Sequence, residues 1–172
     1  SIAKPQAEPA TALEAGHNGC LSAAQCMIMT ASLTGSKQQV VPVDAKVKKK
    51  DLNWAKLGFQ YHRTDYRFSA IHENGEWQPG QLVEDENIAI HEGAPTLHYA
   101  QQCFEGMKAQ TSQDGRVLLF RPDLNHERMR AAAGRLLMPE VPIELFMRGV
   151  EEAVRSNYAW IPPYGSGASL YI

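Results

Sequence analysis

The chain has 172 residues, of which 44% are hydrophobic and 21% are charged, and its formal net charge is −2. This length is typical of one folded domain, and the small net charge gives no electrostatic reason to bind nucleic acid or an anionic membrane. No apolar run approaches the about 20 residues of a membrane-spanning helix. The cysteines at 20, 26 and 103 contain no Cys-x-x-Cys pair, which favours free thiols in a reducing compartment over a disulfide between the first two.

Residues 1–50 differ in composition from the rest of the chain. They are rich in Ala, Ser, Thr and Gln, contain no Arg, Trp, Tyr or Phe, and end in the basic run KVKKK at 46–50. Such a composition buries too little apolar surface to offset the entropy of ordering, so we predict a poorly ordered extension or linker. A solvated basic run is favoured over a nucleic-acid patch, because no aromatic residues are interleaved with it.

Residues 51–172 have the mixture of apolar and polar residues that is typical of a folded domain. The first elements predicted in them are strands. A strand is predicted at 64–71, followed by a hairpin turn at Asn74-Gly75, because this dipeptide tolerates the positive φ angles of a type I′ turn. Trp77 begins the return strand, and a second short strand is predicted at 87–91. These elements predict an antiparallel sheet.

The stretch LHYAQQCFEGMKAQ at 97–110 predicts a short helical turn at 97–102 and then a strand from Phe104 to Thr111. Asp114-Gly115 turns this strand into a partner at 116–120. Gly106 inside the strand indicates a bulge or a close approach to the backbone. Phe104 is expected to be structural.

Two helices and a last strand complete the domain. Pro122 opens a helix at 123–137, with apolar residues on one broad face, and Pro142 opens a helix at 143–157 with Ile143, Phe146, Val150 and Val154 at helical spacing. The loop PPYGSGAS then leads into a strand at 169–172. The predicted fold class is α+β: a two-layer α/β sandwich with an antiparallel sheet and two packed helices.

Four linked motifs over residues 57–172 resemble the branched-chain amino acid aminotransferases: LHYAQQCFEGMKA, DGRVLLFRPDLNHERM, MPEVP and PPYGSGASLYI. These are class IV, fold type IV pyridoxal 5'-phosphate enzymes with two domains. The resemblance implies that 51–172 is the small N-terminal domain, and that the chain is truncated before the catalytic second domain. It also implies a homodimer and an amino-transfer reaction between Leu, Ile or Val and 2-oxoglutarate. We expect a cytoplasmic enzyme rather than a mitochondrial one.

The resemblance also implies roles for single residues. Arg128, in the ERM segment, matches the arginine that binds the cofactor phosphate, and a guanidinium suits this task because its donors form a rigid fork. Phe59, Tyr99 and Tyr171 match aromatic residues that line the pocket for the branched side chain. Such an apolar pocket discriminates weakly between aliphatic side chains, which predicts broad use of the three substrates.

The lysine that forms a Schiff base with the cofactor is expected beyond Ile172. Lys108 lies in the motif, but the family does not use this position, and on a strand its side chain points away from the face of Met107. No histidine or cysteine shows metal-ligand spacing. Two alternatives remain: another class IV enzyme, such as a D-amino acid aminotransferase or an aminodeoxychorismate lyase, or a non-catalytic α/β module that acts through protein contacts.

Overall fold

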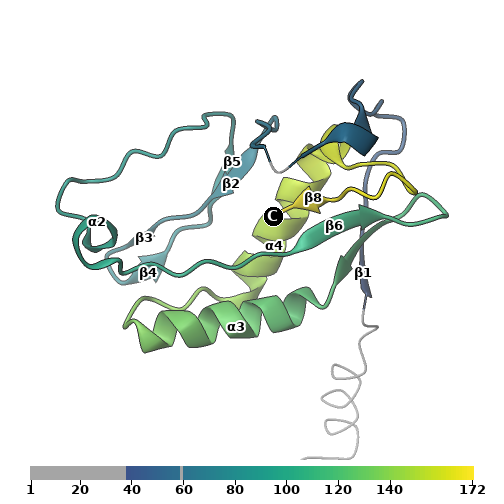
Figure 1. Cartoon of the computed structure of the whole chain (residues 1–172). Helices are drawn as coiled ribbons and strands as arrows, with labels where there is room; N and C mark the ends of the chain where they lie inside the picture. Colours follow the sequence, from purple (N-terminus) through teal and green to yellow (C-terminus); the bar gives the residue numbers. More distant parts are fainter. Residues whose placement is uncertain (1–37, 59) are drawn as a thin grey trace, which may run out of the picture. The chain divides into compact units, whose positions relative to one another are not determined.

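The computed structural model describes residues 38–58 and 60–172. Its strands are β1 (Gln38–Val41), β2 (Arg67–Ser69), β3 (His72–Glu73), β4 (Glu76–Trp77), β5 (Gln81–Val83), β6 (Lys108–Thr111), β7 (Val117–Phe120) and β8 (Leu170–Tyr171). The helices are α2 (Pro95–Tyr99), α3 (Pro122–Arg135) and α4 (Ile143–Ser156), with 3-10 turns η1 (Trp54–Lys56) and η2 (Tyr158–Trp160). Antiparallel sheets combined with helices agree with the predicted α+β class (Figure 1).

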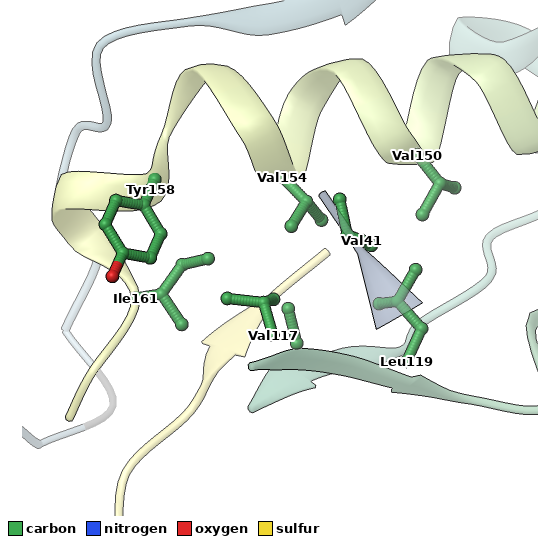
Figure 2. Close-up of a cluster of buried hydrophobic side chains, with 8 residues drawn as sticks. Val41, Val117, Leu119, Val150, Val154, Tyr158 and Ile161 are labelled. Atoms are coloured by element: carbon green, nitrogen blue, oxygen red, sulfur yellow. The ribbon is translucent and has the colours of Figure 1, made fainter. Parts of the chain in front are cut away.

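The core lies between α4 and a four-stranded antiparallel sheet of order β1-β7-β6-β8. Val150 and Val154, one helical turn apart on α4, point toward sheet residues that include Val41 and Leu119 (Figure 2). All four side chains are buried. Burying them removes apolar surface from water, which is the main favourable term in folding this unit. No helix in the described part of the chain is long and apolar enough to cross a membrane.

Both predicted hairpins are confirmed. Asn74 and Gly75, between β3 and β4, have φ angles of 53° and 86°, which a type I′ turn requires. Gly115 has a φ of 82° in the turn that joins β6 to β7. In both places local turn chemistry sets the register of the strands.

The strands themselves differ from the prediction in several ways. The strand predicted at 64–71 is shorter (β2), and 87–91 forms no strand. The strand predicted from Phe104 begins at β6, four residues later, although the backbone of Met107 already pairs with that of Ile172. Residues 60–120 do not form one sheet, because β2 pairs with β5 and β3 with β4, apart from β6 and β7. These differences follow from non-local pairing, which periodicity does not determine.

The start of the folded unit also differs from the prediction. Strand β1 lies within residues 1–50, which we expected to be an extension, and it pairs with β7 so that Val41 faces Val117 in the register. Pairing with a distant strand orders a segment that has little apolar content of its own. The rest of that prediction, for residues 1–37, lies outside the described residues.

The two long helices have nearly the predicted bounds, but their buried faces differ from the prediction. On α3 the buried residues are Pro122, His126 and Ala133. Leu124, Leu136 and Leu137, on the apolar face of the helix predicted at 123–137, are exposed. The ring of His126 is held by a hydrogen bond to the carbonyl of Val141 at 2.8 Å. At the start of α4, Ile143 is 41% exposed, so the predicted apolar face is too long by one turn. The short helical turn predicted at 97–102 is α2, two residues earlier.

Candidate functional site

The site forms where the segment before β6 meets α3, around the carboxylate of Glu105. This side chain is only 5% exposed. It accepts hydrogen bonds from the backbone N–H of Gly106 at 2.8 Å, from Asn125 Nδ2 at 2.9 Å and from Arg128 Nε at 2.6 Å. Nη2 of Arg128 also donates to it. A buried carboxylate is stable only when its oxygens are satisfied in this way.

The hydrogen bonds from Arg128 lower the pKa of Glu105 from 4.5 to about 2, against burial, which raises it; Asn125 and Gly106 also lower it. In return, Glu105 raises the pKa of Arg128. Both groups are therefore charged at neutral pH, and the pair forms a fixed ionic contact between α3 and the start of β6.

Arg128 faces outward although its partner is buried: its side chain is 71% exposed. Glu105 takes the edge of the guanidinium formed by Nε and Nη2. A guanidinium has five N–H donors, so both donors of Nη1 and one of Nη2 remain without a partner among the described residues. This is a donor edge of the kind that binds phosphate or carboxylate with two parallel hydrogen bonds.

Asn125 lies one turn before Arg128 on α3, so both side chains reach the same face. Its Nδ2 donates to Glu105 and, at 3.1 Å, to the carbonyl of Gly106. The sequence analysis missed both Glu105 and Asn125. The three-residue spacing from Asn125 to Arg128 was a visible signal, but nothing local shows that Glu105, 20 positions before Asn125, meets these side chains.

Gly106 brings Tyr171 to this cluster. A Cβ at position 106 would lie 2.8 Å from Cζ of the Tyr171 ring, and closer still to its hydroxyl, so a larger residue would have to displace this ring. The close approach predicted at Gly106 is therefore confirmed. Tyr171 is placed there by β8, where it pairs with Lys108 of β6.

A cavity of about 540 Å³ lies beside this cluster. Glu105 and Tyr171 contribute to its wall, and most of the rest is apolar, including Phe68 of β2, Met129 of α3 and Phe146 of α4. The structure thus places an anion-binding edge and an aromatic ring near an apolar hollow. This combination suits a ligand that has both an anionic group and an aliphatic part.

Of the other predicted site residues, Tyr99 is not part of this cluster. Tyr99, at the end of α2, is 84% exposed, and its ring lies 6.5 Å from that of His98. Phe59 lies outside the described residues. Phe104, which we expected to be structural, is 86% exposed and does not pack in the core.

The neighbouring arginines have other partners. Arg121 binds both carboxylate oxygens of Asp123 at the start of α3, through Nε at 2.8 Å and 3.0 Å and through Nη2 at 2.6 Å. Arg130 forms an exposed ion pair with Glu140 at 3.3 Å. Arg128 is therefore distinguished from its neighbours by a buried partner.

Comparisons with known proteins find relatives that share one name. The chain is 55% identical over 123 residues to a branched-chain-amino-acid aminotransferase of Haemophilus influenzae, covering 72% of this chain and 36% of the relative. A protein of the same name from Helicobacter pylori is 49% identical over 122 residues, covering 71% of this chain and 36% of the relative. The Arabidopsis thaliana branched-chain-amino-acid aminotransferase 1, mitochondrial, is 42% identical over 123 residues, which cover 71% of this chain and 32% of the relative.

No model of a protein family matches the chain. The chain spans about a third of the length of these curated relatives. It is therefore homologous to a part of the branched-chain-amino-acid aminotransferases, as the motifs predict.

Proposed function

We propose that this chain is the small N-terminal domain of a class IV branched-chain amino acid transaminase. The whole enzyme would transfer the amino group of Leu, Ile or Val to 2-oxoglutarate, giving a branched-chain 2-oxo acid and glutamate. The observation that carries the proposal is the 55% identity over 123 residues with the Haemophilus influenzae protein of that name. A similarity this high and this continuous favours a common reaction over the alternative of a non-catalytic module.

Within this proposal, Arg128 binds the phosphate of pyridoxal 5'-phosphate. Three of its N–H donors are available, its side chain is exposed, and it is held from behind by Glu105, so the donor set fits a phosphate dianion. The cofactor would supply the electron sink that amino transfer needs. The residues of this chain contribute the binding and orientation of its phosphate end.

Tyr171 and Tyr99, with Phe59, would contact the aliphatic side chain of the substrate. Tyr171 lines the cavity beside Glu105, while Tyr99 presents nearly its whole ring for a contact with the rest of the enzyme or with a second subunit. The side chains of Leu, Ile and Val carry no polar group that this wall could recognise, so selectivity among the three stays within about 1–3 kcal/mol per methylene.

The proposal extends to a homodimer in the cytoplasm. The bacterial relatives carry no compartment in their names, whereas plant relatives are named mitochondrial or chloroplastic. Sedimentation of the full-length enzyme tests the dimer, and a monomer at every protein concentration measured would contradict this part of the proposal.

Amino-donor specificity tests the function. The full-length enzyme is purified and assayed with leucine, isoleucine, valine, methionine and D-alanine, with 2-oxoglutarate as acceptor. We expect turnover of the three branched substrates and none of D-alanine. Methionine is included because one relative, 38% identical over 136 residues, is named a methionine aminotransferase. Preference for D-alanine would favour the other class IV reaction, and failure of all donors would overturn the proposal.

The site assignment is tested by a matched pair of variants on α3. Arg128→Ala removes a charge-assisted contact to phosphate worth about 1.5–3 kcal/mol, so cofactor affinity should fall by roughly 10- to 100-fold. Arg130→Ala, about 200° round the helix and paired with Glu140, should leave that affinity nearly unchanged. Titration with pyridoxal phosphate measures both. Loss of affinity in the Arg130 variant alone would show that the assignment of Arg128 is wrong.

A further inference from the structure

Glu105 lies at the centre of the cluster, since Gly106, Asn125 and Arg128 all donate hydrogen bonds to its carboxylate. Its carboxylate is buried while that of Glu140, which pairs with the other α3 arginine, is about half exposed. Exposed pairs such as Arg130–Glu140 contribute little to stability. A carboxylate that is desolvated and then surrounded by four donors fixes the position of whatever it binds.

The geometry of the contact decides what Glu105 fixes. Its two oxygens occupy Nε and Nη2, which is the side edge of the guanidinium, and leave the end edge formed by the two terminal nitrogens for another acceptor. A carboxylate on the end edge would compete with phosphate. A carboxylate on the side edge restricts rotation of the Arg128 side chain and leaves the end edge free for phosphate. Asn125 and the backbone of Gly106 hold the carboxylate in turn.

We propose that Glu105 is a positioning residue for anion binding: it holds the Arg128 guanidinium with its end edge outward, ready for the cofactor phosphate. The inference rests on the proposed function, because it assumes that Arg128 meets that phosphate. Arg side chains have many rotamers, and immobilising one at the moment of binding weakens affinity by about 2- to 12-fold. Because Glu105 orders the Arg128 side chain when the chain folds, this loss of conformational freedom does not weaken ligand binding.

The opposite effect must be weighed against this one. The negative charge of Glu105 partly cancels the positive charge that the phosphate meets, so removing it could strengthen binding. The carboxylate lies behind the guanidinium and is separated from the end edge by the width of that group, and the end edge is exposed to water, which screens the repulsion. The ordering effect therefore exceeds the repulsion, and Glu105→Gln should weaken phosphate binding.

The experiment measures the dissociation constants of pyridoxal phosphate and of pyridoxal, which lacks the phosphate, for the full-length enzyme. Glu105→Gln should weaken pyridoxal phosphate binding by about 3- to 10-fold and leave pyridoxal binding unchanged. Glu140→Gln, at the exposed pair on the same helix, is the matched control and should change neither. A general structural defect would weaken the binding of both pyridoxal phosphate and pyridoxal.

A double-mutant cycle shows whether Glu105 acts through Arg128. In an Arg128→Ala background, Glu105→Gln should cause no further loss of pyridoxal phosphate affinity, because the group it positions is gone. If the Glu105→Gln protein does not fold, Glu105→Asp, which keeps the charge but is one methylene shorter, should give a smaller loss with the same selectivity for the phosphate.

Each other result has one meaning. Unchanged affinity in Arg128→Ala would overturn the assignment of the phosphate site and with it this part of the proposed function. A loss in Arg128→Ala but none in Glu105→Gln or Glu105→Asp would overturn the positioning role alone. Tighter binding in Glu105→Gln, equal loss of both ligands, or a further loss in the Arg128→Ala background would also overturn it.

Discussion

The carboxylate of Glu105 makes the free energy of unfolding depend on pH. Its pKa is lowered from 4.5 to about 2 by Arg128, against burial, with help from Asn125 and Gly106. A carboxylate whose pKa is lower in the folded state binds protons preferentially when unfolded, so its contribution to stability is complete above about pH 4.5. That contribution is lost as the pH falls through the folded pKa, near 2.

We therefore expect the difference in unfolding free energy between the wild-type chain and Glu105→Gln to be constant from pH 7 to about 5. It should then shrink steadily between about pH 4.5 and 2. Urea denaturation at a series of pH values measures this difference, and subtracting the variant removes the effect of other carboxylates. A difference that does not change with pH would mean that Glu105 and Arg128 do not form this ion pair in solution.

Gly106 is a second residue whose role can be tested by itself. A methyl group at this position meets the ring of Tyr171, with 2.8 Å from Cβ to Cζ, so Gly106→Ala must displace the ring or the strand that carries it. Overpacking in a well-packed core costs about 1–3 kcal/mol of stability, and because Tyr171 is 65% exposed and its ring can turn aside, we expect a cost near the lower limit. Thermal or urea unfolding of the chain measures it.

Two further variants separate the contact from the general cost of replacing glycine. Tyr171→Ala removes the obstacle, so Gly106→Ala should cost much less in that background. Gly58→Ala is the matched control, because within the described part of the chain no atom beyond its sequence neighbours lies within 4 Å of a Cβ there. An equal cost of Gly106→Ala with and without the Tyr171 ring would contradict the packing described here.

At the scale of elements, the face that α4 presents to the sheet is the main source of stability. Val154 is fully buried against the sheet, so Val154→Ala should cost about 2 kcal/mol through lost burial and a small cavity. Ile143, which the sequence pattern assigns to the same face, is 41% exposed, and Ile143→Ala should cost less than about 1 kcal/mol. Equal losses of unfolding free energy in the two variants would support the predicted face rather than the observed one.

The elements that could be predicted from the sequence are those with local causes. Asn74-Gly75 and Asp114-Gly115 specify their own turns, and the prolines at 122 and 142 open α3 and α4 at the observed places. The pairing of β1 with β7 and of β2 with β5 is set by packing between distant segments, and short strands carry too little pattern to reveal it. The face of α3 was mispredicted because its middle is rich in alanine, which fits either side of a helix.

The candidate site divides in the same way. Arg128 and Tyr171 could be named because each lies in a motif of the family that the chain resembles. Glu105 and Asn125 could not, because their role exists only when the segment before β6 lies against α3. Tyr99 matches the motif equally well, yet its ring stands apart from the cluster. Under the proposed function, we expect Tyr99 to meet the other motif residues only in the whole enzyme.

At the scale of the whole molecule, the proposed two-domain enzyme raises the question of what the 172-residue chain does by itself. The curated relatives are about three times as long as the segment that matches them, and the resemblance places the lysine that binds the cofactor covalently in their second domain. Arg128 alone would hold the phosphate with a single ionic contact open to water, which gives at most weak binding.

We therefore expect the isolated chain to show no transamination of leucine with 2-oxoglutarate, while the full-length enzyme is active. With pyridoxal phosphate and borohydride, mass spectrometry should find no specific adduct on the isolated chain and one on a lysine of the second domain in the full-length enzyme. Lys108 is the lysine to watch, since it pairs with Tyr171 next to the proposed site and its side chain is exposed. A specific adduct at Lys108 together with turnover by the isolated chain would show that the chemistry resides in this domain, contrary to the two-domain proposal.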